Sequence, residues 1–428
     1  MTGVRAGIVV TGTEVLSGLV RDANGPWLSG RLRELGVDVA HVMVVGDRPS
    51  DLRAALAFLV GEGIDLVVTS GGLGPTADDL TADVVASFSG RPMAVDAALE
   101  ERIWSIVAGM RNRWREVSEE GLRAGARKQA LVPEGATVLE PVGTAPGLVV
   151  PGEPVILVLP GPPGELQPMW ETARSVPAVE GLLSHAGSLE TRIIRMTGLP
   201  ESELARTLRG LTVGPELEVT TCLRRGELEV ATTFPAPAGA AAYEAFEAAL
   251  LERHGDRVFS RDGSTIDEIV ADLLRGPPVR TVAVAESCTG GLMAARLTDR
   301  PGSSAYVQGG VVVYSNEAKV AQAGVAAEAI ERFGAVSPEV ARELADGAAE
   351  RFGASLGVGI TGIAGPGGGT PAKPVGTVCL CVSGGPSGVV ERTVHIPGDR
   401  ATVRDRSTTA AMHMLRRTLQ SGGTAAAA

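Results

Sequence analysis

Ser287, Cys288 and Thr289 stand side by side where an expected strand, Val279–Ala285, turns into an expected helix, Gly291–Leu297. A hydroxyl, a thiol and a second hydroxyl at such a turn suit a nucleophile or a phosphate cradle, because the start of a helix offers free N–H groups. A Ser/Thr cap followed by glycines that let helix and strand pack closely explains the same residues. The turn alone therefore leaves both interpretations open.

Hydrolysis of an amide at this turn would need a nucleophile, a base and a group that stabilises the oxyanion. We favour Ser287 as nucleophile; Cys288 is the rival, because a helix N-terminus lowers the pKa of a thiol. No histidine falls in these motifs, so a Ser-His-Asp arrangement is not supported. Tyr314 ends the strand expected at 307–314 and Lys319 lies just beyond it; one of them supplies the base, either a lysine of lowered pKa or the phenol.

A glycine-dense string, Thr361–Thr370 (TGIAGPGGGT), ends a third expected strand and is expected to wrap a ligand. It is not a Walker A loop, because the GxxxxGK[ST] spacing is absent. Ligands of open α/β sheets bind beyond the carboxyl ends of the strands. The three strings are therefore expected to meet at one edge of a sheet.

A second set of candidate residues lies nearer the N-terminus. Thr69–Thr81 (TSGGLGPTADDLT) follows an expected strand and opens a helix. Gly71 and Gly72 allow the backbone to approach a ligand, and the helix start suits an anion. Asp78 and Asp79 beside a phosphate suggest a divalent cation. In the alternative interpretation, one of these aspartates merely caps the helix.

Lysine is scarce in this chain: of 39 basic residues only three are lysine, namely Lys128, Lys319 and Lys373. An ammonium group is compact and loses its proton when buried, whereas a guanidinium does not. The three lysines therefore either stand at positions where arginine could not replace them, or their positions are due to chance.

The elements expected around these residues define an α/β protein. Over the first ~170 residues short β-branched strands alternate with helices, which predicts a three-layer α/β domain with a mainly parallel sheet at 1–172. Residues 264–420 repeat the pattern. Between them, 173–260 is expected to form a small α+β unit in β-α-β-β-α order, KH-like but without a GXXG loop, which we interpret as a spacer and dimer element. The last segment, 421–428, is expected to be frayed.

Composition excludes several classes of protein. The net charge of −11 gives no global attraction for DNA, RNA or anionic lipid. A chain that is 44% hydrophobic and 21% charged is not wholly disordered. No apolar run approaches the ~20 residues that span a bilayer, and no leader pattern opens the chain, so no membrane association is expected. The four scattered cysteines predict neither disulfides nor a zinc site, which favours the cytoplasm.

Five strings in the first 170 residues resemble the N-terminal domain of the CinA family, which is similar to the molybdopterin-binding MoaB/MogA fold. They are Thr11–Leu16 (TGTEVL), Thr69–Thr81, Lys128–Ala130 (KQA), Gly143–Gly147 (GTAPG) and Pro160–Glu165 (PGPPGE). The resemblance implies an ADP-ribose pyrophosphatase activity that depends on a divalent metal ion. By matching motif it implies a site made of Glu14, Gly71, Gly72, Asp78, Asp79 and Lys128, in which Glu14, Asp78 and Asp79 are the metal ligands.

Five further strings resemble the C-terminal domain of the same family, a nicotinamide mononucleotide (NMN) deamidase that forms nicotinate mononucleotide and ammonia without a cofactor. They are Ala285–Gly291 (AESCTGG), Tyr314–Lys319 (YSNEAK), Gly334–Ser337 (GAVS), Thr361–Thr370 and Lys373–Thr377 (KPVGT). The resemblance implies a catalytic set of Ser287, Tyr314, Lys319 and Thr361. The residues expected to bind substrate are Thr289, Gly290, Gly365, Gly367, Gly368, Arg400 and Arg404. The two arginines lie one turn apart on the last helix, and arginine binds phosphate with two parallel hydrogen bonds.

The sequence thus predicts a bifunctional hydrolase whose substrates are NMN and ADP-ribose, and the resemblance suggests a homodimer. Two alternatives stay open. One is a protein that binds a molybdopterin-like ligand without hydrolysing anything at its N-terminal site. The other is a competence or DNA-damage-response protein that acts through partners. The acidic charge and the lack of a basic stripe count against direct contact with nucleic acid.

Overall fold

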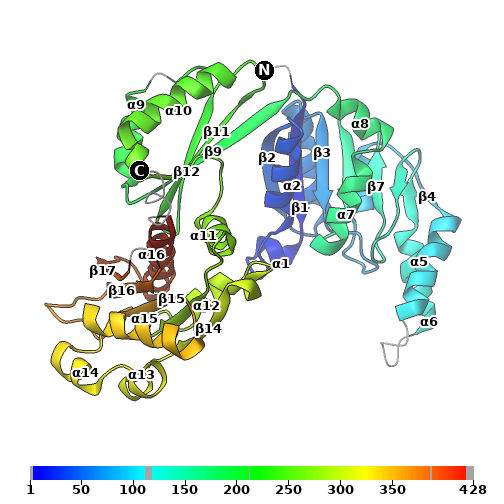
Figure 1. Ribbon diagram of the computed structural model, residues 1–428. Coiled ribbons are helices and arrows are strands. Elements are labelled where there is room, and N and C mark those ends of the chain that lie inside the picture. The colour runs from blue at the N-terminus through cyan, green and yellow to red at the C-terminus, as the bar shows by residue number, and fades with distance from the viewer. Residues whose placement is uncertain (1–2, 111–117, 212, 386–387, 421–428) are drawn as a thin grey trace. The chain divides into compact units, whose positions relative to one another are not determined.

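The computed structural model describes residues 3–110, 118–211, 213–385 and 388–420 (Figure 1). It divides into two compact units, Met1–Glu190 with Thr233–Ala241, and Thr191–Thr232 with Ala242–Ala428. The domain boundaries predicted after residues 172 and 260 stay predictions, and the predicted frayed tail, 421–428, lies outside the described residues.

The first unit alternates strands and helices as expected. Its elements are β1 (Arg5–Thr11), α1 (Thr13–Leu16), α2 (Asn24–Glu34), β2 (Asp38–Val45), α3 (Pro49–Gly61), β3 (Leu66–Ser70), α4 (Thr81–Phe88), β4 (Met93–Val95), α5 (Ala97–Met110), α6 (Glu119–Gln129), β5 (Leu131–Pro133), β6 (Thr137–Leu139), β7 (Gly147–Val150), β8 (Val155–Leu159), α7 (Pro163–Ala173) and α8 (Pro177–Leu183). The main sheet has the order β2-β1-β3-β8-β7-β6. β2, β1, β3 and β8 are parallel, whereas β7 pairs antiparallel with both neighbours, which the sequence analysis did not anticipate.

Helices cover both faces of this sheet. Successive strand residues face opposite sides. Ile8 and Val10 of β1 belong to a core shared with α2, α7 and α8 (Figure 1). Val9 belongs to a second core, shared with α3, α4 and α5. The predicted three-layer architecture is confirmed.

The second unit contains a small sheet and a larger one. The small sheet and its two helices consist of β9 (Leu189–Thr197), α9 (Glu201–Arg209), β10 (Glu218–Arg224), β11 (Glu227–Pro235), α10 (Ala240–His254) and β12 (Val258–Ser260). They build the middle sheet, of order β10-β11-β9-β12. The β-α-β-β-α order matches the expectation, and the short edge strand β12 was not predicted.

The larger sheet positions the predicted deamidase residues. Its elements are α11 (Ile266–Arg275), β13 (Val282–Glu286), α12 (Leu292–Thr298), β14 (Val307–Val312), α13 (Asn316–Ala323), α14 (Ala327–Phe333), α15 (Pro338–Phe352), β15 (Leu356–Gly362), β16 (Thr377–Gly384), β17 (Val390–His395) and α16 (Arg400–Gln420). The order is β14-β13-β15-β16-β17, with the first three parallel and the last two antiparallel to their neighbours. Val282 and Val284 pack with α11, α12 and α16, and Ala283 and Ala285 with α13 and α15, so this is again a three-layer fold.

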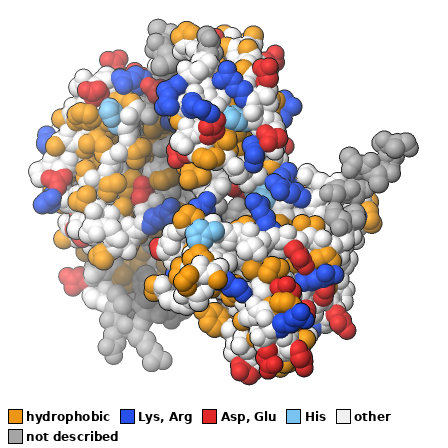
Figure 2. Space-filling view, turned by 90° about the vertical axis from the view of Figure 1, so that its left-hand side faces the viewer, with side chains coloured by type: hydrophobic (Ala, Val, Ile, Leu, Met, Phe, Trp, Pro, Cys, Tyr) orange, Lys and Arg blue, Asp and Glu red, His pale blue; other side chains and the backbone are white. Residues whose placement is uncertain are grey.

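Two further properties bear on the membrane and nucleic-acid interactions that the composition argued against. Within the described ranges, no helix has both the length and the apolar character needed to cross a bilayer. On the face drawn in Figure 2, basic and acidic side chains are intermixed with hydrophobic ones.

Candidate active sites

A pocket of about 360 Å³ lies beyond the carboxyl ends of β1, β3 and β8 in the first unit. The predicted glycine turn forms one of its walls. Gly71 has a φ of 106°, and a Cβ atom there would lie 2.6 Å from the carbonyl oxygen of Thr11. Only glycine therefore lets the turn after β3 approach β1 this closely.

Carboxylates dominate the polar lining of this pocket. They are Glu14, Asp47, Asp78, Asp79 and Glu165. The Thr76 hydroxyl donates to the carboxylates of both Asp78 and Asp79. Its bond to Asp78 is the main cause that lowers the pKa of that carboxyl group. Helix α4 begins without a side-chain cap, so the interpretation of these aspartates as helix caps is wrong.

The donor set fits a hard divalent cation that is shared with a phosphate ligand. Mg²⁺ takes oxygen ligands, commonly one or two carboxylates together with waters and substrate phosphates. Among the described residues, no three His, Cys, Asp or Glu side chains lie close enough to form an all-protein metal cage. Asp78 and Asp79 are the pair that would hold such a cation, and Glu14 lines the same pocket.

Two further polar side chains lie near the aspartate turn or in the pocket wall: Lys128 contacts the turn, and Glu165 lines the pocket. Lys128, near the end of α6, donates its Nζ proton to the carbonyl oxygen of Thr76 and so holds the turn. Burial raises the pKa of the Glu165 carboxyl group. A Cβ atom at Gly143 would lie 2.4 Å from Glu165 Oε1, so the glycine leaves room for this carboxylate. Gly143 and Glu165 both stand in motifs found from sequence, but the sequence could not predict that they lie against each other.

The second candidate site lies at the carboxyl edge of the larger sheet, where the three predicted strings do meet. Glu286, the last residue of β13, stands between Val312 of β14 and Ile360 of β15. The backbone N–H of Ser287 donates to the carbonyl of Ile360 over 2.9 Å. The turn that begins at Ser287 is thus fixed to the end of β15.

Ser287 and Cys288 differ in their suitability as nucleophile. Ser287 is 8% exposed and Cys288 is 5% exposed. Desolvation raises the pKa of the Cys288 thiol to about 12, so at neutral pH it carries a proton and does not act as a thiolate. The short helix that follows therefore does not activate Cys288, and Ser287 is the better candidate.

Glu286 already occupies the start of α12. Its carboxylate is fully buried and accepts hydrogen bonds from the backbone N–H groups of Gly291 and Met293, both at 3.0 Å, and of Ala294 at 2.8 Å. An anion of the protein itself thus satisfies the N–H groups that the sequence analysis offered to a phosphate. The phosphate-cradle interpretation of this helix start is wrong.

Two arginines at the start of α16 hold the site loops. Arg404 donates from Nε to the carbonyl of Cys288 at 3.2 Å and from Nη2 to that of Thr289 at 2.9 Å. Arg400 donates to the hydroxyl of Tyr314 at 2.8 Å and to the carbonyl of Gly365 at 2.9 Å. Arg404 therefore positions the Ser287 turn, while Arg400 lies between Tyr314 and the glycine loop.

Lys319 is buried beside these groups and is only 2% exposed. Its Nζ donates to the carbonyls of Val313 at 3.2 Å and Tyr314 at 3.3 Å, and desolvation lowers its pKa. The backbone N–H of Val313 donates to the carbonyl of Glu286 over 2.7 Å, so the carbonyl that Lys319 binds belongs to the residue paired with the start of the Ser287 turn. Thr361 donates its hydroxyl proton to the carbonyl of Ala335 at 2.7 Å, so it ties the end of β15 to the GAVS segment.

The other predicted binding residues surround this group. Gly290 lies against Arg404, and Gly367 and Gly368 are exposed in the same loop as Gly365. Thr289 is fully buried and its carbonyl accepts a hydrogen bond from Arg404, while its role in binding substrate stays a prediction.

Lys373 was not selected from sequence as a site residue. Its Nζ donates to the carbonyls of Phe333 at 2.8 Å and Val336 at 2.7 Å. Two signals in the sequence pointed to it: the rarity of lysine in this chain and its place in the KPVGT string. Each of the three lysines thus holds a main-chain turn next to a candidate site.

Comparison with known proteins finds a matching family model for each of the two parts of the chain that hold a candidate site. A family model described as the CinA C-terminal domain matches residues 264–419, and one described as a probable molybdopterin binding domain matches residues 7–179. The CinA-like protein of Mycobacterium sp. (strain MCS) is 58% identical over 422 residues, which cover 98% of this chain and 99% of that protein. The chain belongs to the CinA family. The CinA-like protein of Mycobacterium tuberculosis (strain ATCC 25177 / H37Ra) is 54% identical and covers 97% of both chains.

Among solved structures of the CinA family, the competence/damage inducible protein CihA from Agrobacterium tumefaciens is 39% identical. The match covers 37% of this chain and 99% of that one, with a TM-score of 0.35. The predicted membership of the CinA family is confirmed by the full-length relatives.

Proposed function

We propose that the second unit hydrolyses the carboxamide of NMN to nicotinate mononucleotide and ammonia. The observation that carries this proposal is Lys319, a buried amine at the same sheet edge as the Ser287 turn. A lysine nitrogen has four tetrahedral positions, of which one is the side-chain bond and two donate to carbonyls. The fourth position holds a proton in the ammonium and a lone pair in the amine, and burial favours the amine.

In the proposed reaction, Ser287 Oγ attacks the carboxamide carbon while the Lys319 amine takes the hydroxyl proton. Collapse of the tetrahedral intermediate breaks the C–N bond, and the Lys319 ammonium returns its proton to the departing nitrogen, so that ammonia leaves. Water then attacks the acyl ester, with Lys319 again as base. This releases the carboxylate and restores the Ser287 hydroxyl.

The arginines take different parts in this proposal. Arg400, which reaches Tyr314 and the glycine loop, keeps further N–H donors for the substrate phosphate. Arg404 holds the Ser287 turn through two carbonyls and acts as a positioning residue.

The test of this activity is to incubate the full chain with NMN and to measure ammonia and nicotinate mononucleotide together. Equal amounts of both products are expected. Absence of both in a folded, concentrated sample would refute the proposal and favour a protein that acts through partners.

We also propose that the first unit hydrolyses ADP-ribose in the presence of a divalent cation. The support is the carboxylate-lined pocket with its glycine turn. Asp78, Asp79 and Glu14 would hold the cation, whose charge offsets that of the diphosphate. AMP and ribose 5-phosphate are the products to measure, with and without Mg²⁺ or Mn²⁺. Binding of ADP-ribose without turnover would favour the ligand-binding alternative, with a molybdopterin-like compound as the next ligand to test.

The surroundings that we propose for these activities follow from the family and the composition. We infer a homodimer in the cytoplasm that contacts neither membrane nor nucleic acid. Sedimentation analysis tests the dimer.

A further inference from the structure

Helix α16 links the NMN site to the middle sheet. Arg400 and Arg404, one turn apart, contact the site loops. The next residues of the helix contact other elements: Asp405 lies 3.4 Å from Arg225, and Thr408 and Thr409 accept hydrogen bonds from Arg296. Whatever fixes these residues also fixes the two arginines, because a helix moves as a stiff rod over so few turns.

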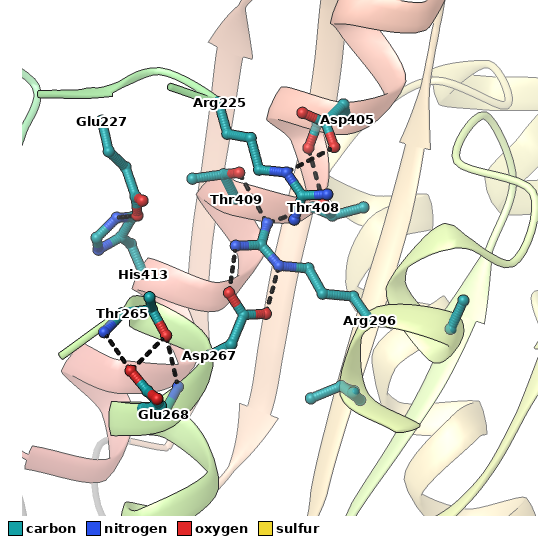
Figure 3. Close-up of polar contacts among 12 residues, drawn as sticks. Arg225, Glu227, Thr265, Asp267, Glu268, Arg296, Asp405, Thr408, Thr409 and His413 are labelled. Atoms are coloured by element: carbon teal, nitrogen blue, oxygen red, sulfur yellow. Dashed lines mark hydrogen bonds and ion pairs between the residues drawn. The ribbon is translucent and has the colours of Figure 1, made fainter. Parts of the chain in front are cut away.

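Arg296 fastens α16 to the helix that follows the Ser287 turn. It stands on α12, and its guanidinium makes two parallel bonds to the Asp267 carboxylate of α11, at 2.6 and 2.8 Å (Figure 3). Its remaining Nη1 donors reach Thr408 and Thr409 at 3.2 and 2.8 Å. Three helices of the larger sheet are thus joined at one guanidinium.

The turn between β10 and β11 supports α16 from the middle sheet. Its two residues, Arg225 and Gly226, have φ values of 54° and 86°, as in the type I′ turns of two-residue hairpins. Asparagine, aspartate or glycine would fit the first position with less strain than arginine does. Arg225 is the only non-glycine residue with positive φ among the described residues. Its side chain reaches Asp405, next in sequence to Arg404 (Figure 3).

The next residue of the hairpin makes a second, buried contact with α16. Glu227 Oε1 and His413 Nε2 are 2.6 Å apart, and both side chains are more than nine-tenths buried. The His413 ring packs edge-on against Phe259 of β12 at 4.8 Å between centroids. The hairpin therefore holds α16 at two points about two turns apart.

We infer that the β10–β11 hairpin is a positioning element for the NMN site, because it holds α16 and through it Arg400 and Arg404. This inference rests on the proposed function and gives the middle sheet a part beyond the spacer and dimer element expected from sequence. Arg225 and Glu227 act through α16 and touch no substrate.

The decisive experiment uses the full chain with R225D, D405R and the double variant R225D/D405R. Aspartate suits a positive φ, so R225D improves the turn while it replaces an ion pair with repulsion at Asp405. We expect kcat/KM for ammonia release from NMN to fall roughly three- to fivefold in R225D, the upper part of the range for loss of one exposed ion pair, because the change also adds repulsion. The double variant, which restores opposite charges, should return to within about twofold of the natural chain.

E227A and E227Q form the second pair of variants. Glutamine keeps an oxygen that accepts the His413 Nε2 proton, whereas alanine does not. We expect E227A to lose activity and E227Q to retain most of it. R261D is the matched control, because Arg261 pairs with Glu247 of α10 at 2.9 Å in the same part of the chain and contacts no residue of α16 by hydrogen bond or ion pair in the described residues.

Hydrogen exchange of the 287–294 and 400–409 amides gives a readout that needs no turnover, and should accelerate in R225D and E227A but not in R261D. Normal kcat/KM and normal exchange in both variants would overturn the inference. So would a double variant as impaired as R225D, or a lowered Tm as the sole effect. If the natural chain releases no ammonia, the proposed function fails, and exchange alone decides on the hairpin.

Discussion

In the first unit, the polar groups beyond the sheet edge are carboxylates that face an open pocket, whereas in the second they are a hydroxyl, a buried amine and guanidinium groups bonded to the main chain. Both sets stand at the carboxyl ends of parallel strands and beside glycine turns. The two sets differ in how they would balance the charge of an anionic ligand. Five carboxylates repel a diphosphate unless a cation joins them, while the second site brings its own positive charges.

The same sheet edge can therefore be prepared for an anionic ligand in two ways. One relies on a cation that arrives with the ligand. The other relies on positive charges that the chain has already placed, in the guanidinium groups of Arg400 and Arg404. The start of α12 is not part of this arrangement, because Glu286 already occupies it.

The largest expected effect is that of S287A. Ammonia release from NMN should fall by roughly 10³-fold or more, because the nucleophile is gone while the pocket keeps its shape. Cleavage of ADP-ribose by the same sample should not change, which makes it the internal control. C288A should stay active; a dead C288A with an active S287A would reverse the assignment.

K319R should have the next largest effect. Arginine reaches about as far as lysine but cannot give up its proton, so kcat should fall roughly 10²–10⁴-fold, the usual contribution of a general base. Because the pKa of Lys319 is lowered, activity of the natural chain should rise as pH rises through that pKa. A K319R variant with normal kcat and an equal Tm would leave Tyr314 as the better base.

D78N should affect only the first unit. Loss of one carboxylate of the pair should reduce cation-dependent ADP-ribose cleavage roughly 10–100-fold and raise the Mg²⁺ concentration needed for half-maximal rate. Ammonia release should not change. A variant with normal ADP-ribose cleavage at limiting Mg²⁺ would remove Asp78 from the cation site.

The smallest effect concerns pH. Burial lowers the pKa of His413 below its ordinary 6.5, and the positive charges of Arg416 and Arg417 on its own helix lower it further. The hydrogen bond and the negative charge of Glu227 of β11 raise this pKa, but burial outweighs them. The unfolded chain thus binds a proton below about 6.5 that the folded chain resists, so the free energy of unfolding should fall as pH falls through that range and stay level above it. Asp78, with its lowered pKa, keeps its charge there. Thermal unfolding of the natural chain and of H413Q between pH 8 and 5 checks this, and equal pH profiles would contradict it.

Much of the second site could be predicted because strand order and motif position suffice for it. Ser287 and Tyr314 follow strands and Thr361 stands near the end of one, and parallel strands deliver their carboxyl ends to one edge. Lys319 was singled out by its rarity. The strands that escaped prediction, such as β6, β7 and β12, have only three or four residues, too few to show a periodicity.

The contacts that hold the site could not be predicted, for a physical reason. Arg404 and Lys373 bind main-chain carbonyls, which every residue has, so no sequence pattern marks their partners. Glu286 lay inside a quoted motif, yet only the geometry shows that it fills the helix start. The Glu227–His413 contact joins residues 186 positions apart, and neither residue has a signature of its own.

The scarcity of lysine also has a practical consequence. Since Lys128, Lys319 and Lys373 each hold a turn beside a candidate site, every side chain that an amine-reactive reagent labels lies beside such a site, and only the α-amine of the chain is labelled elsewhere. Lys128 and Lys373 are partly exposed, whereas Lys319 is 2% exposed. The order in which the three ε-amines acquire label, followed by mass spectrometry, would therefore report how often each turn opens, in a chain whose remaining basic side chains are invisible to the reagent.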